Sequence, residues 1–150
     1  MQLEDILPHR SPLLLLSEVI EVSSEKLLSR VNITDESLFF SGLLVPNYVS
    51  IEYMAQTVGL FMGLEVGNHQ KKPKVGFLIG VRQFECSIDG FRNGDNLIIE
   101  ADPLLVEDPV GNFKCRVILN DNCVASARLT VYRPTQGELK KMGNSLMEKK

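Results

Sequence analysis

The fold of this chain is decided by the stretch VPNYVSIEYMAQTVGLFMGLEV, residues 45–66. Apolar side chains fall on nearly every side of the helix that this stretch predicts, and a helix that is apolar all round is buried rather than laid on a surface. Two polar residues, Glu52 and Gln56, lie four positions apart and therefore share one face. Gly59 and Gly63 continue the same row, where they leave room for another backbone to come close. A carboxyl group on a buried central helix is the feature to explain.

Length and composition limit the class of protein. The chain has 150 residues, which suit one domain. Its apolar content of 44% and charged content of 23% are ordinary for a globular protein. The net charge of -3 argues against a nucleic-acid binder, which needs a basic surface. No uninterrupted apolar run reaches the ~18 residues of a membrane span, so no membrane-spanning segment is expected.

The N-terminus and the cysteines indicate a cytoplasmic protein. The first ten residues, MQLEDILPHR, carry acids where a signal peptide would be basic. The three cysteines, Cys86, Cys115 and Cys123, have no CxxC spacing and are expected to be reduced and structural. A catalytic thiol is the alternative, but it needs a nearby histidine, and the chain has only two. We expect no metal and no cofactor.

The rest of the chain predicts six strands, two before the helix and four after it. Apolar patterns place them at residues 13–22, 26–33, 75–88, 97–106, 113–119 and 123–132. One helical turn is expected at residues 3–7, and the central helix is expected to start at Pro46 and to end at Gly67-Asn68. This order favours an α+β arrangement, an antiparallel sheet of about six strands wrapped around a long central helix, which is the hotdog fold. We expect the hotdog domain to span residues 1–134 and a polar C-terminal tail to span residues 135–150.

Several segments resemble the hotdog-fold 3-hydroxyacyl-acyl-carrier-protein dehydratases of fatty acid synthesis. These segments are LPHRSPLLL at residues 7–15, EYMAQ at 52–56, FLIGVRQF at 77–84 and the Gly94-Asp95 turn. The resemblance covers nearly the whole chain. It is strongest to the dehydratase-like branch of bacterial aryl polyene and polyketide-type lipid pathways, through FFSG at residues 39–42, VP at 45–46 and IEYMAQ at 51–56.

One departure from that family concerns the base. The housekeeping enzymes place a catalytic histidine at the head of His-Phe-Pro-Gly, just before the helix. Here the slot holds Phe39, and a shift of one residue would place Leu38 there instead. Asn47 stands in the family's helix-start glycine slot. The resemblance therefore implies that the usual catalytic base is missing.

Dehydration of a 3-hydroxyacyl thioester needs a base for the C2 proton, an acid for the leaving hydroxyl and a donor for the thioester oxygen. Glu52 is the candidate acid, because burial raises the pKa of a carboxyl group, and Gln56 can orient it by a hydrogen bond. Backbone N–H groups at the helix N-terminus, near Asn47 and Tyr48, are the candidate donors. His9 is the candidate replacement base, delivered from the N-terminal segment.

Glu52 and His9 also have purely structural interpretations. Glu52 could instead form an ion pair with Arg82, since an unpaired buried charge costs several kcal/mol. His9 could simply order the N-terminus, because the housekeeping enzymes carry a similar segment and use a different histidine. Phe39 and Phe40 are expected in the core or in the lining of an acyl tunnel. The expected substrate-binding set is Gln56, Asn47, Tyr48, Phe39, Phe40, Gly80 and Arg82.

The resemblance implies an enzyme that dehydrates 3-hydroxyacyl thioesters on acyl carrier protein to 2-enoyl thioesters. Two alternatives stay open, a non-catalytic subunit that pairs with a true hotdog dehydratase and an acyl thioester hydrolase on the same fold. In this fold the active site commonly lies at a two-fold interface, which implies a homodimer or higher oligomer, or a heterodimer with another hotdog subunit. We expect the contact to use residues 75–88 and Glu52 to face a tunnel near it. The basic loop at residues 68–74, which contains His69, is expected to be a solvated turn.

Overall fold

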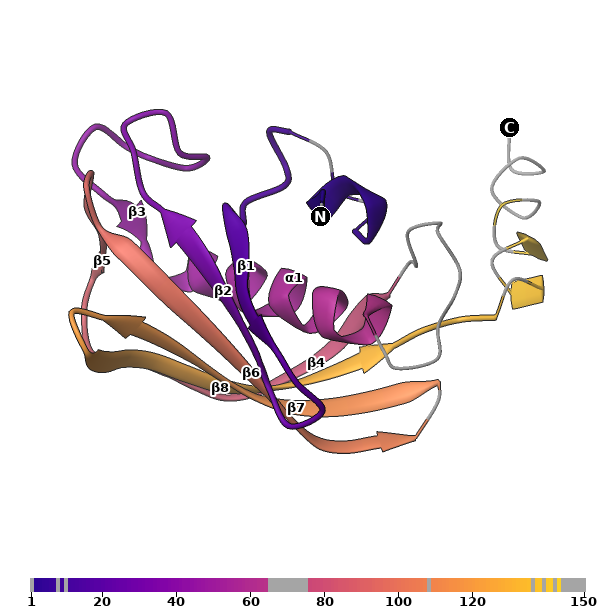
Figure 1. Cartoon of the computed structure of the whole chain (residues 1–150). Coiled ribbons are helices and arrows are strands. Elements are labelled where there is room, and N and C mark those ends of the chain that lie inside the picture. The colour runs from indigo at the N-terminus through magenta and orange to yellow at the C-terminus, as the bar shows by residue number, and fades with distance from the viewer. Residues whose placement is uncertain are drawn as a thin grey trace.

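A computed structural model describes residues 2–7, 9, 11–64, 76–107, 109–135, 137, 138, 140, 141 and 143. Six strands form one antiparallel sheet in the order β1-β2-β6-β7-β8-β4, and the sheet wraps around helix α1 (Figure 1). The strands are β1 (Glu18–Val22), β2 (Leu27–Asn32), β4 (Phe77–Cys86), β6 (Asn96–Glu107), β7 (Val110–Leu119) and β8 (Asn122–Tyr132). The predicted α+β hotdog fold is confirmed.

Helix α1 spans Ser50–Gly63 and follows a 3-10 turn at Asn47–Val49. It begins later than predicted, and the expected start at Pro46 is wrong. The predicted end at Gly67-Asn68 lies outside the described residues.

A short second sheet explains the late start of the helix. Strand β3 (Val45–Pro46) pairs with β5 (Gly90–Phe91), so the two residues that were expected to open the helix are extended. Gly90 makes this pairing feasible, because a Cβ atom there would lie 2.3 Å from the carbonyl oxygen of Val45. The start of the helix is thus set by a partner far away in the sequence.

Aromatic contacts join α1 to both sheets, through Phe91 on β5 of the short sheet and Phe113 on β7 of the large one. The rings of Tyr53 and Phe91 lie 6.2 Å apart, and Phe61 meets Phe113 edge to face at 5.4 Å. Such pairs add about 0.5–1.5 kcal/mol to the burial of their area.

Two hydroxyl groups join the helix to the sheet inside this core. Ser29 on β2 and Thr57 on α1 are fully buried, and their hydroxyl oxygens lie 2.7 Å apart. Thr57 donates to the carbonyl oxygen of Tyr53 at 2.8 Å, which leaves the Ser29 hydroxyl as the donor to Thr57. Both hydroxyls are therefore satisfied in the core.

The first strand is shorter than predicted. β1 begins at Glu18, whereas the apolar run predicted a strand from residue 13. The backbone of Leu13 and Leu15 bonds to the side chain of Gln56 and not to a neighbouring strand. The predicted strands from residue 26 onward correspond to β2, β4, β6, β7 and β8, with ends that differ by a few residues.

Two features lie toward the ends of the described part of the chain. The helical turn predicted near the N-terminus is a 3-10 turn at Leu3–Asp5. Near the other end, the Arg133 guanidinium donates to the carbonyl oxygen of Met62 at 3.2 Å, which favours the C-terminal end of α1. Pro134 is buried and Thr135 is exposed, so we propose to retain the domain boundary between residues 134 and 135.

Candidate active site

Three side chains meet at the first turn of α1. Nε2 of His9 lies 3.5 Å from Oε1 of Glu52, and Nε2 of Gln56 donates to the same oxygen at 3.0 Å. The side chains of His9 and Glu52 are 32% and 47% exposed in the single chain. The structure therefore brings together both candidate catalytic residues and the glutamine expected to orient the acid.

Gln56 fixes this arrangement through both ends of its amide group. Its Oε1 accepts from the backbone N–H of Leu15 at 2.9 Å, and its Nε2 also donates to the carbonyl oxygen of Leu13 at 2.8 Å. The residue is only 1% exposed. Since the amide oxygen is committed to an N–H donor, the amide nitrogen must face Glu52. Gln56 thus orients the carboxylate and holds the N-terminal segment against the helix.

The expected rise in the pKa of Glu52 is wrong for the single chain. Partial burial does raise this pKa, but hydrogen bonds from His9 and Gln56 and the charge of His9 outweigh it, so that the pKa lies below its ordinary value of 4.5. Glu52 is consequently a carboxylate at neutral pH.

The structural interpretation that paired Glu52 with Arg82 is also wrong. Among the described residues Glu52 pairs with His9 and not with Arg82. Arg82 lies on β4 directly across from Arg128, which is exposed between the buried Ala127 and Leu129. Cross-strand neighbours share a face, so Arg82 lies on the sheet face opposite α1.

Gly80 is placed on β4 as well, opposite Thr130 at a shift in the strand register. β4 is the last strand of the sheet, so it forms one of its edges. The single chain does not join Gly80 or Arg82 to Glu52, and their part in substrate binding stays a prediction.

The three aromatic residues of the predicted substrate-binding set, Phe39, Phe40 and Tyr48, differ in exposure. Phe40 is half-buried and packs against the core. Phe39 is 61% exposed with a backbone φ of 69°, and Tyr48 is 63% exposed. A positive φ is uncommon for a bulky residue. The expectation of a core position for Phe39 is therefore wrong for the single chain.

Asn47 does not supply the N–H group expected to face the thioester oxygen. Its backbone N–H donates to the carbonyl oxygen of Asp89 at 3.1 Å, and its side-chain amide donates to that of Ile88 at 2.9 Å. Asn47 therefore anchors the start of the helix region to the segment before β5. Tyr48 remains the candidate donor from the predicted pair.

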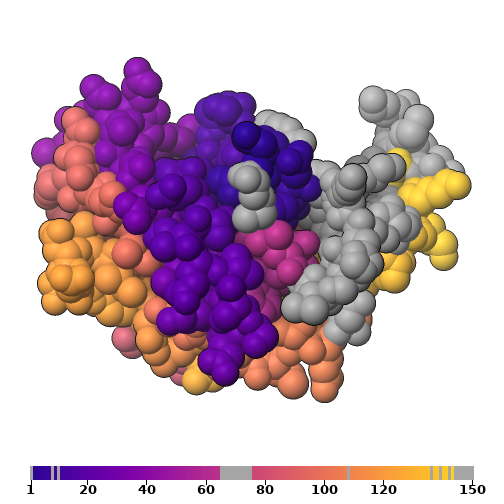
Figure 2. Space-filling model, viewed as in Figure 1, coloured from indigo at the N-terminus to yellow at the C-terminus, as the bar shows by residue number. Residues whose placement is uncertain are grey.

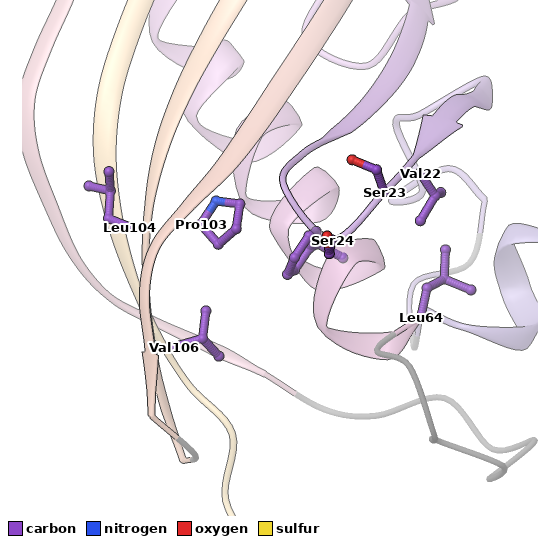
Figure 3. Close-up of a pocket in the computed structure, with 8 residues that line it drawn as sticks. Val22, Ser23, Ser24, Leu64, Pro103, Leu104 and Val106 are labelled. Carbon is purple, nitrogen blue, oxygen red and sulfur yellow. The ribbon is translucent and has the colours of Figure 1, made fainter.

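A cavity that the sequence analysis did not predict lies at the opposite end of the helix (Figure 3). It has a volume of about 440 Å³ and lies between the β1–β2 turn, the end of α1 and the second half of β6, where Ser24, Leu64 and Pro103 line it. At 1.5 Å per residue, Leu64 is roughly 18 Å along the helix axis from Glu52. The cavity is separate from the His9–Glu52 pair.

Other sequence predictions concern groups away from this pair. All three cysteines have free thiols, and burial raises the pKa of Cys115 to about 12, which makes it a poor nucleophile. Within the described ranges, no cluster of three or more His, Cys, Asp or Glu side chains could hold a metal ion. No helix in the described part of the chain is long and apolar enough to cross a membrane. The basic loop and His69 lie outside the described residues.

Comparison with known proteins places the chain in a family. Residues 1–144 match the family described as ApeP-like, ApeP dehydratase. The chain belongs to the ApeP-like dehydratase family. The predicted resemblance to the hotdog-fold acyl-carrier-protein dehydratases is thereby confirmed.

Individual relatives agree with this family. The chain is 30% identical over 137 residues to the 3-hydroxyacyl-[acyl-carrier-protein] dehydratase FabZ of Bacillus pumilus, covering 86% of this chain and 91% of that protein. It is also similar to a solved chain of the dehydratase heterocomplex ApeI:P from Xenorhabdus doucetiae, with a TM-score of 0.85 and 27% identity over 96% of this chain and 98% of that one. A hypothetical thioesterase with coenzyme A from Streptococcus pneumoniae has a TM-score of 0.61 over 79% of this chain and 86% of that one, but its 12% identity shows only a shared fold.

Proposed function

We propose that this protein dehydrates a 3-hydroxyacyl thioester carried by acyl carrier protein to the 2-enoyl thioester. The observation that carries the proposal is Glu52 held between His9 and Gln56 on the central helix of an ApeP-like dehydratase. A carboxylate beside an imidazole supplies both proton-transfer groups that the reaction needs. Because the relatives include dehydratases that act on acyl carrier protein, the substrate class follows from the family.

In the proposed reaction one proton leaves C2 and one proton is added to the hydroxyl group on C3. A base removes a proton from C2, the electron pair forms the C2–C3 double bond, and the C3 hydroxyl leaves as water after it receives a proton. Charge that builds on the thioester oxygen during this step needs a donor. We assign that role to the N–H of Tyr48 at the start of the helix region.

The lowered pKa of Glu52 supports a reversal of the roles expected from the sequence. The reaction needs one group of the pair to accept a proton and the other to donate one, and with Glu52 ionised the accepting group is Glu52. In this assignment the Glu52 carboxylate accepts the C2 proton and His9 donates a proton to the leaving hydroxyl. The sequence-based assignment, with Glu52 as acid and His9 as base, describes the same pair with the proton on the other partner. The two forms carry the same number of protons, so a pH–rate profile does not separate them; titration of the Glu52 carboxyl resonance followed by NMR does.

Association of two hotdog subunits is part of the proposal. Strand β4 forms an edge of the sheet and exposes Phe77, Leu78, Ile79 and Val81, each at least 38%. An apolar edge strand is a ready template for pairing with another chain. We propose that two copies pair along β4, and that Glu52 faces an acyl tunnel that the second subunit helps to close. The proposed reaction belongs in the cytoplasm, where free thiols such as those of this chain persist.

A second candidate is a subunit that completes the site of another hotdog chain. Phe39 favours it, because this residue stands where the resemblance implies a catalytic histidine and is exposed in the single chain. The relative of known structure from Xenorhabdus doucetiae is part of a dehydratase heterocomplex, which supports a heteromeric assembly here. In that assembly the partner would contribute the histidine and this chain Glu52.

The hydrolase alternative requires Glu52 to activate water for attack on the thioester carbonyl.

The experiment that decides among the dehydratase, the heteromeric subunit and the hydrolase is an assay of purified protein with 3-hydroxyacyl thioesters on acyl carrier protein, analysed by mass spectrometry. Loss of water from the acyl group by the protein alone is the expected result. Activity only after addition of a second hotdog subunit selects the heteromeric subunit, and release of a free acid selects the hydrolase.

A further inference from the structure

Two glycines, Gly59 and Gly63, lie on one face of α1 between the catalytic pair and the C-terminal end of the helix. Gly59 and Gly63 follow Glu52 and Gln56 on the same helical face, because residues at i, i+4, i+7 and i+11 lie above one another. Two glycines in a helix interior or last turn are costly for the helix itself, so their presence calls for a packing reason.

The N-terminal segment occupies the space that these glycines leave. A Cβ atom at Gly63 would lie 2.5 Å from Cγ2 of Ile6, and one at Gly59 would lie 3.0 Å from Cδ2 of Leu7. Ile6 and Leu7 are 9% and 1% exposed, so both are packed. Figure 2 shows the indigo N-terminal segment lying directly beside the magenta surface of the helix.

Successive parts of the N-terminal segment therefore contact the same row on the helix. Ile6 and Leu7 pack on the two glycines, His9 reaches Glu52, and Gln56 holds the backbone of Leu13 and Leu15. His9 comes two residues after Leu7, so its distance from Glu52 depends on where the N-terminal turn is seated.

We propose that Gly63, with a lesser contribution from Gly59, is a positioning residue that brings His9 to Glu52. The absence of a side chain at Gly63 lets the N-terminal turn seat against the helix, and the seated turn fixes the imidazole at the carboxylate. The inference rests on the proposed function for the role of His9 in the reaction. The placement of His9 can be tested without it.

The two glycines differ in how much a side chain would disturb. Cγ2 of Ile6 is attached to a branched Cβ whose χ1 is stiff, so Ile6 cannot turn away easily. Cδ2 of Leu7 is the far end of a longer side chain and can shift by a few tenths of an ångström. Gly63→Ala is therefore the sharper test, and Gly59→Ala should have a smaller effect in the same direction.

The experiment combines a rate with a titration. Gly63→Ala should lower the dehydration rate on the order of 10²-fold, the cost of a misplacement of about 1 Å at a reacting group. In the same variant, the carboxyl resonance of Glu52 followed by NMR should titrate at higher pH, because the contact with His9 that lowers its pKa is lost. A role for Gly63 in stability alone would leave this titration unchanged.

A compensating substitution makes the test specific. In the variant Ile6→Ala/Gly63→Ala the clashing Cγ2 atom is gone, and the next atoms, the Ile6 carbonyl oxygen at 3.6 Å and Cβ at 3.8 Å, are at ordinary contact distance. The double variant should recover rate and titration relative to Gly63→Ala. Val58→Ala, in the core of the same helix, is the control that lowers stability and leaves the titration of Glu52 as in the wild type.

The proposal is overturned if Gly63→Ala leaves the Glu52 titration as in the wild type, or if the double variant recovers neither measurement. If the wild type does not dehydrate the substrate but the titration shifts and recovers as described, the placement of His9 by Gly63 stands. The proposed function then fails separately.

Discussion

Nε2 of His9 lies 3.5 Å from Oε1 of Glu52, so a side chain from the N-terminal segment meets the carboxylate of the central helix. Neither element could build this pair alone. The helix supplies the carboxylate and the glycine row, and the N-terminal turn supplies the imidazole. The pair is thus an outcome of tertiary packing, and it responds to changes on either side.

The first prediction concerns stability and pH. The folded-state pKa of Glu52 is lowered, so its hydrogen bonds stabilise the fold above its unfolded pKa of about 4.5, and this stability is lost as the pH falls through the lower folded value. The difference in free energy of unfolding between wild type and Glu52→Gln should therefore shrink below about pH 4.5. Urea unfolding at pH 7 and at pH 3 measures it. A difference that grows on acidification would contradict the direction of the pKa shift.

The second prediction concerns the buried amide. Gln56→Leu leaves the N–H of Leu15 and the carbonyl of Leu13 without their partner, which should cost about 1–3 kcal/mol of unfolding free energy. The N-terminal segment should also exchange its amide hydrogens faster. Gln2→Leu, an exposed glutamine with no comparable contacts, serves as the control and should change stability by less than about 0.5 kcal/mol. Equal effects of the two substitutions would show that Gln56 does not hold this segment.

The third prediction tests the hydroxyl pair in the core. Thr57→Val leaves the fully buried Ser29 hydroxyl without its acceptor and should destabilise the protein by about 1–3 kcal/mol. Adding Ser29→Ala should cost much less in this background than in the wild type, because the two hydroxyls act as a unit. Denaturant unfolding of the two single variants and the double variant measures the coupling. Additive losses would rule out the pair as a unit.

The fourth prediction concerns subunit association through β4. Ile79 is 59% exposed on this edge strand, and Ile79→Lys should weaken pairing because a charge on an edge disfavours strand addition. Light scattering after size exclusion should then show a smaller species than in the wild type. Leu105→Lys, at a residue 55% exposed on β6, is the matched control. If both variants keep the wild-type mass, β4 is not the interface.

Local sequence patterns predicted the main helix and the strands. They did not predict where an element starts when a contact with residues far away in the sequence sets that start. The apolar stretch around Met54 predicted the buried helix, and alternation predicted the strands. The helix start at Pro46 was missed because β3 pairs with β5 at Gly90, a contact that local patterns do not reveal. The start of β1 was missed because the side chain of Gln56 bonds to the backbone of the preceding residues.

In the candidate site, too, local spacing was predictive and the effects of long-range contacts were missed. The spacing of Glu52 and Gln56 predicted their shared face, and the hydrogen bond between them agrees with it. The pKa of Glu52 was expected in the wrong direction because its sign depends on hydrogen-bond donors, one of which comes from the N-terminal segment. The exposure of Phe39 was missed because apolar composition alone does not distinguish a core residue from one at the surface of the single chain.

The most direct test of the account compares wild type, Glu52→Gln and His9→Ala in the interconversion of 3-hydroxyacyl and 2-enoyl thioesters on acyl carrier protein. Each substitution should lower the rate on the order of 10²–10⁴-fold, the usual contribution of a general acid or base, while circular dichroism shows a folded protein. Dehydration by the wild type with such losses in both variants is the predicted result. A folded Glu52→Gln variant that dehydrates the substrate at the wild-type rate would contradict the account.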